Sequence, residues 1–294
     1  MGEDIGPLGG VFRVTDGLQK DFGEDRVIDA PLAESGIVGT AVGLAMRGYR
    51  PVLEIQFDGF VFPAFDQIVT MVAKHHYRSG GITRMPMVIR IPYGGGIGAV
   101  EHHSESPEAY FAHTPGLRVL TPADAAEAYV TIQQAIASDD PVIYLEPKRR
   151  YWDRAEVDEA SAISGDPWSS RVLRSGADVT LVAYGRWCAP AWRRPRPPRR
   201  TAWSARHRPA LALAARPRSG RRRRPADGTL HRGARGAGGP GRRCRGGRGR
   251  LAEVLLPPRG PVERVGGAFL PYPPIAMSTT ICLTSTASST RSIG

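Results

Sequence analysis

Cysteine is absent from the first 187 residues of this 294-residue chain, because Cys188, Cys244 and Cys282 all lie further on. This absence excludes a disulfide framework and a cysteine metal site from that part of the chain. The chain also lacks an apolar run of membrane-spanning length and a secretory signal segment. We therefore expect a cytoplasmic domain without membrane contact.

Nine residue types are absent from residues 187–250: Val, Ile, Phe, Met, Tyr, Glu, Gln, Asn and Lys. Such a segment has almost nothing with which to build a core. The formal charge changes at the same point, from −8 over residues 1–186 to +20 over residues 187–294, where all 23 basic residues are Arg.

The missing residue types are largely those with A/T-containing codons, so a GC-rich gene read in a wrong frame would give this composition. We interpret the chain as frameshifted from about residue 187. An Arg-rich arm that binds nucleic acid is the alternative. On the frameshift interpretation, residues 187–260 form no packed domain and ordered structure ends near residue 185.

Short apolar runs alternate with helical stretches in the first 186 residues. This alternation predicts an α/β fold, a parallel sheet with helices on both faces. The predicted strands are 26–30, 50–55, 85–91, 117–122 and 141–146, and the predicted helices are 35–47, 63–78, 107–112 and 123–137. Residues 1–152 form the first domain, 153–177 a linker and 178–294 the remnant of a second domain, which begins with a strand at 178–185.

Two polar residues are candidates for function. Glu34 precedes a helix that carries Gly36, Gly39 and Gly43, and glycines at that spacing let a backbone or a flat ligand approach closely. Otherwise Glu34 simply complements the positive end of the helix. His103 lies in the Gly-rich loop 93–106, where it is either catalytic or an ordinary loop histidine.

Five stretches together resemble the beta subunits of thiamine-dependent 2-oxo acid dehydrogenases: GEDIGPLGGVFRVTDGL, PLAESGIVGTAVGLAMRGYRPVLEIQF, FPAFDQIV, HHSESPEAYFAHTPGLRVLTP and EPKRRYW. The resemblance covers Met1 to about Gly185. Within it, HSESPEAYFAHTPG favours the branched-chain type over pyruvate dehydrogenase. In that family this segment is the pyrimidine-binding domain of a transketolase-like pair.

The resemblance implies a role for four residues. Glu34 would hydrogen-bond a ring nitrogen of the aminopyrimidine of thiamine diphosphate, and Phe60 would pack on that ring with Gln56 on the wall of the site. His103 matches a loop histidine near the substrate that is implicated in reaction with the lipoyl group.

The resemblance also implies a potassium site, largely of backbone carbonyls, formed by Met87, Ala135, Ile136, Ser138 and Asp140. Ser138 stands where relatives often have Asp. The expected partners are an alpha subunit, in an assembly of two alpha and two beta chains, and a lipoylated acyltransferase core. The alpha subunit would hold the diphosphate and its magnesium, so this chain would carry half of each active site.

Two departures from the family pattern stand out. The chain begins directly at the GED turn, where the family has a helix and a strand before it, so we expect the true start to lie upstream. Residues 261–274, PVERVGGAFLPYPP, resemble the family again, which indicates that the frame returns briefly. A nonfunctional product of a damaged gene is therefore a further alternative.

Overall fold

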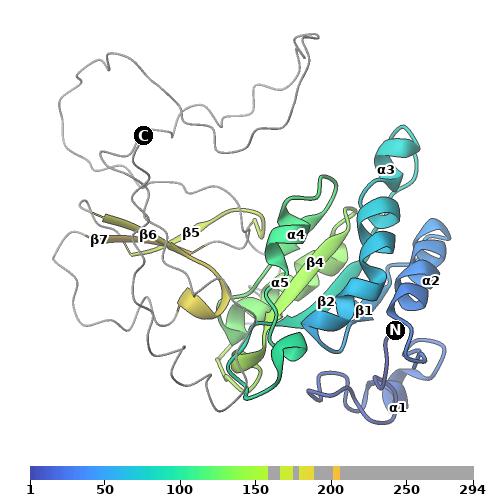
Figure 1. Cartoon of the computed structure of the whole chain (residues 1–294), viewed down its shortest axis with the longest axis horizontal. Helices are drawn as coiled ribbons and strands as arrows, with labels where there is room; N and C mark the ends of the chain where they lie inside the picture. The colour runs from blue at the N-terminus through green and yellow to red at the C-terminus, as the bar shows by residue number, and fades with distance from the viewer. Residues whose placement is uncertain (158–165, 175–178, 189–200, 206–294) are drawn as a thin grey trace, which may run out of the picture.

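The computed structural model describes residues 1–157, 166–174, 179–188 and 201–205. Its main body is a parallel four-stranded sheet in the order β1-β2-β4-β3 (Figure 1). The strands are β1 (Val52–Glu54), β2 (Val88–Tyr93), β3 (Arg118–Leu120) and β4 (Val142–Pro147). These confirm the last four of the five strands predicted for the first domain.

Helical segments connect the strands and cover the sheet. They are α1 (Leu18–Phe22), α2 (Glu34–Met46), η1 (Asp58–Ala64), η2 (Gln67–Val72), α3 (His75–Arg78), η3 (Glu101–His103), α4 (Glu108–Ala112), α5 (Ala125–Ala137) and η4 (Lys148–Arg150). The short η segments are 3₁₀ turns, except η2, which is a wider π-helical turn.

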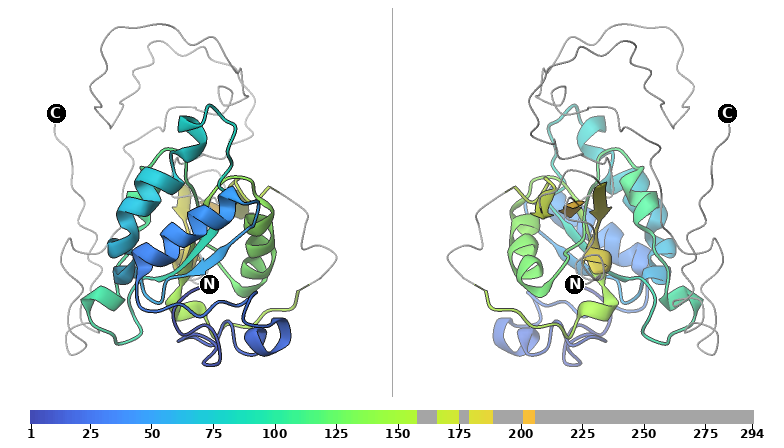
Figure 2. Two further views of the ribbon diagram at one scale, coloured as in Figure 1. Left: turned by 90° about the vertical axis from the view of Figure 1, so that its right-hand side faces the viewer. Right: turned by 90° about the vertical axis from the view of Figure 1, so that its left-hand side faces the viewer.

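The sheet is buried on both faces. Its side chains alternate in direction along each strand, so each strand contributes residues to two separate cores. Ile89 and Ile143 belong to a core shared with α2, η1, η2 and Phe111 of α4. Val88 and Val142 belong to a second core, which includes Ala135 of α5. Figure 2 shows α2 and α5 on opposite sides of the sheet. The predicted α/β fold with helices on both faces is confirmed.

Two predicted elements were wrong. Residues 26–30 do not form a strand, and only Asp29 makes an isolated parallel bridge, to Gly2. Residues 63–78 do not form one helix but pass from η1 through η2 to α3. The N–H of Ala73 bonds to the carbonyl of Ile68, five residues back, so the helix widens there.

A second sheet lies apart from the first (Figure 1) and has the order β5-β7-β6. Its strands are β5 (Arg171–Arg174), β6 (Val179–Ala183) and β7 (Thr201–Ala205). β6 confirms the strand predicted at 178–185, and β5 falls inside the predicted linker. The division of the chain into domains stays a prediction.

β7 overturns one expectation about the chain after residue 185. This strand lies within the Arg-rich segment. It pairs antiparallel with β5 and parallel with β6. The expectation that ordered structure ends near residue 185 is therefore wrong for residues 201–205. The rest of residues 189–260 and the stretch 261–274 lie outside the described residues. In the described ranges, no helix combines the length and apolar character needed to cross a bilayer.

Candidate functional site

The residues predicted to be catalytic or to bind the cofactor gather at the carboxyl edge of the main sheet. Gln56 follows β1, the loop that carries His103 follows β2, and Lys148 follows β4. Gly2 bridges to both Asp29 and Glu54, so the chain that leads into α2 lies level with the end of β1. Glu34 begins α2 just beyond that level. Ligands of parallel α/β sheets bind at this edge.

The Glu34 carboxylate is half-buried and makes no hydrogen bond or ion pair with any described residue. Its charge is felt by Glu3, whose pKa is raised by burial and then by Asp4, Glu34 and Asp29. Both Glu34 oxygens therefore remain available to a ligand.

The helix glycines do not serve a close approach within the part of the chain that the structure describes. A Cβ at Gly39 would meet only the Gln67 side chain, at 3.9 Å, and one at Gly43 would meet nothing within 4 Å. The expectation of a neighbouring backbone against this helix was thus wrong for the described residues. The glycine face of α2 is open, as a flat ligand or a partner would require.

Phe60 and His103 are brought together in an aromatic cluster. The two ring centroids are 5.1 Å apart in an edge-to-face arrangement, and Phe57 lies 4.0 Å from His103. His102 stacks on Phe60 from the solvent side of the turn, at 6.2 Å. Phe57 is half-buried and contacts the candidate histidine.

The backbone of the histidine turn rests directly on η1. A Cβ at Gly59 would lie 2.3 Å from the carbonyl oxygen of His102, so only glycine fits there. Burial lowers the pKa of His103, with His102 and Lys148 acting in the same direction. Its Nδ1 is buried and has no hydrogen-bond partner among the described residues. His103 is therefore neutral near pH 7 and can accept a proton.

Gln56 is anchored rather than free. Its Nε2 donates to Oδ2 of Asp4 over 2.9 Å, which ties the N-terminal turn to the end of β1. Asp4 adopts a positive φ of 58°, a conformation that Asp tolerates better than most residues. This contact fixes the Gln56 side chain at the edge of the site.

Sequence reasoning missed a buried ion pair at the same edge. Lys148 Nζ donates to Oδ1 of Asp58 over 2.6 Å, and both side chains are 0% exposed. The available signal was a charged residue inside the aromatic run QFDGF and another directly after a buried strand in EPK. The two residues are 90 positions apart, so no local pattern pairs them.

A second buried network crosses the sheet. Arg90 on β2 bonds to Oε2 of Glu54 over 2.6 Å and, with two nitrogens, to Glu146 over 2.7 and 2.9 Å. Tyr151 donates to the same Glu146 carboxylate over 2.5 Å. The network locks the ends of β1, β2 and β4 together, which makes the edge that carries the site rigid.

The residues predicted to bind potassium lie around the C-terminal end of α5 and the start of β4: Met87, Ala135, Ile136, Ser138 and Asp140. All five carbonyl oxygens already accept an internal hydrogen bond. Arg50 Nη1 donates to the carbonyls of Ile136 and Ser138, over 3.2 and 2.8 Å. Each carbonyl keeps a second lone pair, but an ion would share two of them with a guanidinium.

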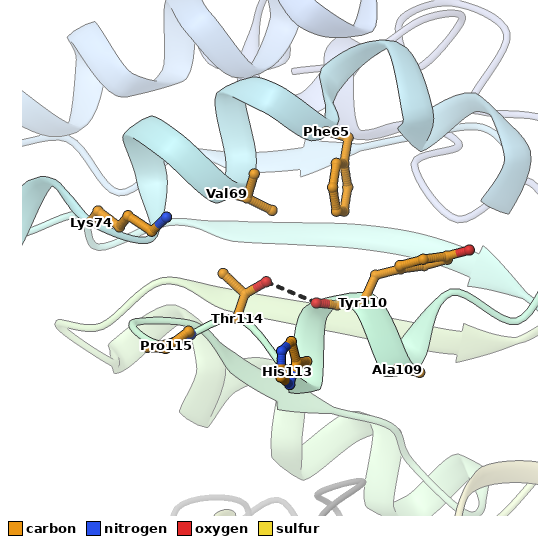
Figure 3. Close-up of a pocket in the computed structure, with 8 residues that line it drawn as sticks. All are labelled: Phe65, Val69, Lys74, Ala109, Tyr110, His113, Thr114 and Pro115. Atoms are coloured by element: carbon orange, nitrogen blue, oxygen red, sulfur yellow. Dashed lines mark hydrogen bonds between the residues drawn. The ribbon is translucent and has the colours of Figure 1, made fainter. Parts of the chain in front are cut away.

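A groove of about 500 Å³ lies between the helical stretch around η2 and α4 (Figure 3). Phe65 and Val69 point into it from one side, and Tyr110 lies on the other. The hydroxyl of Thr114 donates to the carbonyl of Tyr110 over 2.8 Å and closes the turn after α4. None of the predicted site residues lines this groove, which is therefore separate from the candidate site.

Comparison with known proteins gives consistent relatives. The family described as "Transketolase, pyrimidine binding domain" matches residues 1–152. The beta subunit of the pyruvate dehydrogenase E1 component of Leifsonia xyli subsp. xyli is 64% identical over 187 residues, which cover 63% of this chain and 54% of the relative. The beta subunit of 3-methyl-2-oxobutanoate dehydrogenase of Mycobacterium tuberculosis is 56% identical over 185 residues, which cover 63% and 53%.

Among solved structures, a split-gene transketolase described as an inactive beta4 tetramer is similar, with a TM-score of 0.48 and 23% identity. The similarity covers 67% of this chain and 60% of that one. The chain spans about half the length of the curated relatives that it matches.

Proposed function

This chain belongs to the transketolase pyrimidine-binding domain family, and from this premise we propose that it binds the aminopyrimidine half of thiamine diphosphate. Over its N-terminal 63% the chain is homologous to the beta subunits of pyruvate and branched-chain 2-oxo acid dehydrogenases. The observation that carries the proposal is an unpaired, half-buried carboxylate, Glu34, at the same sheet edge as the Phe60–His103 cluster.

The side chains present fit an aminopyrimidine. Glu34 has two free oxygens for a ring nitrogen, Phe60 offers a partly buried ring for stacking, and Asp4 holds Gln56 at the end of β1. Thiamine diphosphate, when bound, supplies a nucleophilic thiazolium carbon for attack on a 2-oxo acid. Glu34 would hold a proton at the pyrimidine ring nitrogen, a task for which a carboxylate in a water-excluding site is suited.

His103 would act at the mouth of the site. It lies on a turn that η1 supports, and its lowered pKa keeps the imidazole neutral near pH 7. A neutral imidazole accepts a proton and returns it, and acyl transfer to a lipoyl disulfide breaks the S–S bond and releases one sulfur as a thiolate that must gain a proton. We assign His103 to that step rather than to the decarboxylation itself.

The assembly follows from the same premise. An alpha subunit would hold the diphosphate and magnesium, two alpha and two beta chains would form the enzyme, and a lipoylated acyltransferase would receive the acyl group. The potassium site at the backbone carbonyls after α5 stays a prediction. Arg50 already donates to two of these carbonyls, those of Ile136 and Ser138.

The 2-oxo acid is the least specified part of the proposal. The loop sequence favours a branched-chain substrate, whereas the relative with 64% identity is named for pyruvate and the one with 56% for 3-methyl-2-oxobutanoate. We propose oxidative decarboxylation of a 2-oxo acid and retain the branched-chain type as a prediction, with pyruvate as the alternative.

The proposal is tested by mixing the chain, with its reading frame restored after residue 186, with an alpha subunit of this enzyme class. Decarboxylation of pyruvate and of 3-methyl-2-oxobutanoate is then measured with an artificial electron acceptor, with and without thiamine diphosphate. We expect cofactor-dependent turnover only when both chains are present. No turnover with either acid, in a mixture shown to assemble, would contradict the proposal.

A further inference from the structure

The Lys148–Asp58 ion pair lies next to the aromatic cluster that contains His103. Lys148 Nζ is 5.7 Å from the centre of the Phe57 ring, and that ring is 4.0 Å from His103. The pair, Phe57 and His103 therefore form one continuous series of contacts. Both charged side chains are fully buried, so water does not screen them as it would at the surface.

Stability alone is a weak reason to bury these charges. Removing two charges from water costs more than their attraction returns unless the geometry is excellent, and apolar replacements of such pairs are often neutral or stabilising. Here Asp58 Oδ2 has no hydrogen-bond partner among the described residues. Burial raises the pKa of Asp58 to about 6 and lowers that of Lys148, so burial works against both charges. A buried pair of this kind indicates a role other than stabilising the fold.

The position of the pair indicates that role. Asp58 begins η1, and Lys148 begins η4 directly after β4. The pair therefore fastens η1 to the end of a central strand. η1 carries Gly59, which receives the backbone of the histidine turn, and Phe60, whose ring meets His103 edge to face.

We propose that Lys148 and Asp58 are positioning residues for His103: the pair fixes the η1 turn on which the histidine rests and so keeps the imidazole packed against Phe57 and Phe60. This inference deepens the proposed function, and it rests on that function for the importance of His103. The geometric argument stands on contacts of this chain alone.

The charged groups around His103 determine in which direction its titration midpoint moves when the ion pair is removed. Glu101 and His102 lie on its own turn, Lys148 on η4 and Asp58 on η1. Burial lowers the pKa of His103 most, His102 and Lys148 lower it further, and Glu101 opposes them. Removing the Lys148 charge therefore moves the His103 titration midpoint upward.

The test is an NMR titration of the full chain labelled with ¹³C-histidine, in wild type and in the double variant Asp58→Asn/Lys148→Met. His103→Asn assigns the signal. We expect a midpoint that is higher in the double variant than in wild type. An unchanged midpoint in a folded double variant would overturn the proposal.

Tyr144→Phe serves as the matched control. It removes a buried hydroxyl that bonds to Thr131 over 3.0 Å and to the carbonyl of Ala128 over 3.1 Å, between α5 and β4. A general loosening of the fold would affect the His103 midpoint in this variant too. We expect the midpoint to stay at its wild-type value, and an equal shift would argue that the pair is merely structural.

A second measurement covers the case in which the double variant does not fold. The lysines of the chain are Lys20, Lys74 and Lys148, so ¹³C-lysine labelling resolves each of them in wild type. Because coupling is reciprocal, the Lys148 signal must move as His103 titrates, while Lys20 and Lys74 do not follow it. A Lys148 signal that ignores the His103 midpoint would overturn the proposal.

Failure of the proposed function gives a different result. If the His103 midpoint rises in the double variant but acyl transfer to a lipoyl acceptor by the assembled, frame-restored enzyme is unchanged between pH 6 and 8, the positioning inference holds. The assignment of His103 to acyl transfer is then wrong.

Discussion

At the scale of single residues, His103 is the side chain whose surroundings point most directly to chemistry. It contacts Phe57 and Phe60, its Nδ1 is buried, and its pKa lies below the usual value. A histidine prepared in this way exchanges protons near neutral pH without carrying a permanent charge.

We predict that His103→Ala, in the frame-restored enzyme, slows acyl transfer to a lipoyl acceptor by on the order of 10²-fold, the usual effect of losing a general acid–base group. Decarboxylation followed with an artificial electron acceptor should change far less. His113→Ala, an exposed histidine beside the groove of Figure 3, is the control. Equal losses in both assays would indicate a structural role for His103.

Asp58 gives a pH dependence of stability with a defined sign. Its pKa rises from 3.8 to about 6 on folding, chiefly through burial, so the folded chain retains a proton that the unfolded chain releases between pH 4 and 6. Stability from this group is therefore fully present below about pH 4 and is lost as pH rises through 6, with a slope of at most about 1.4 kcal/mol per pH unit.

Urea unfolding of wild type and of Asp58→Asn/Lys148→Met between pH 4 and 7 measures this contribution. We expect the difference in unfolding free energy, wild type minus variant, to fall as pH rises across the window. A difference that is constant with pH would show that Asp58 ionises normally in the folded chain.

At the scale of elements, the corner where α5 meets β4 combines a cation and a predicted cation site. Arg50 donates to the carbonyls of Ile136 and Ser138 and to the carboxylate of Asp139. An ion at this corner competes with the guanidinium for the same oxygens.

We predict that potassium chloride, compared with sodium chloride at equal ionic strength, slows amide exchange in residues 135–142. The difference should be larger in Arg50→Met, because two carbonyls lose their guanidinium donor. The partly exposed Arg50 contacts themselves contribute about 1 kcal/mol or less to stability. Arg47→Met, an exposed arginine after α2, is the control. Identical amide exchange in the two salts, for both wild type and Arg50→Met, would contradict the predicted potassium site.

The sequence predicted elements well where pattern and burial agree. β2 and β4 are mostly apolar and almost wholly buried, typical of strands covered on both faces, and each carries one charged residue, Arg90 or Glu146. α5 follows its N-cap Asp124, whose side chain accepts the N–H of Glu127. The break in the helix at 63–78 was not predicted, because single 3₁₀ and π turns are short exceptions within a helical run and carry no local sequence signal here. Both η1 and η2 pack against α2, a contact that no local pattern shows.

The site shows the same division. Glu34, Gln56, Phe60 and His103 were reached through motifs that are local in sequence. The Asp58–Lys148 pair and the Glu54–Arg90–Glu146 network join residues that are distant in the chain, and only the fold brings them together. The strand predicted at 26–30 is reduced to a single bridge, because the backbone of Ile28 and Ala30 bonds to Gly2 alone among the described residues.

At the scale of the whole molecule, the chain combines a well-formed pyrimidine-binding domain with a sequence of different character after residue 186. From composition we predict that residues 190–250 form no packed domain beyond the pairing of β7 with β5 and β6. Hydrogen exchange should find slow amides in that range only at 201–205. Slow amides spread through residues 206–250 would contradict the frameshift interpretation.

The central claim is that Glu34 holds the pyrimidine ring, and one substitution tests it most directly. Glu34→Gln is prepared in the frame-restored chain with the proposed alpha subunit, beside Glu24→Gln, an exposed glutamate, as control. Thiamine diphosphate binding and 2-oxo acid decarboxylation are measured on the same samples. We predict that binding persists while turnover falls on the order of 10²–10⁴-fold, since the change removes a proton-holding group and little contact area. Wild-type turnover in Glu34→Gln would contradict the account.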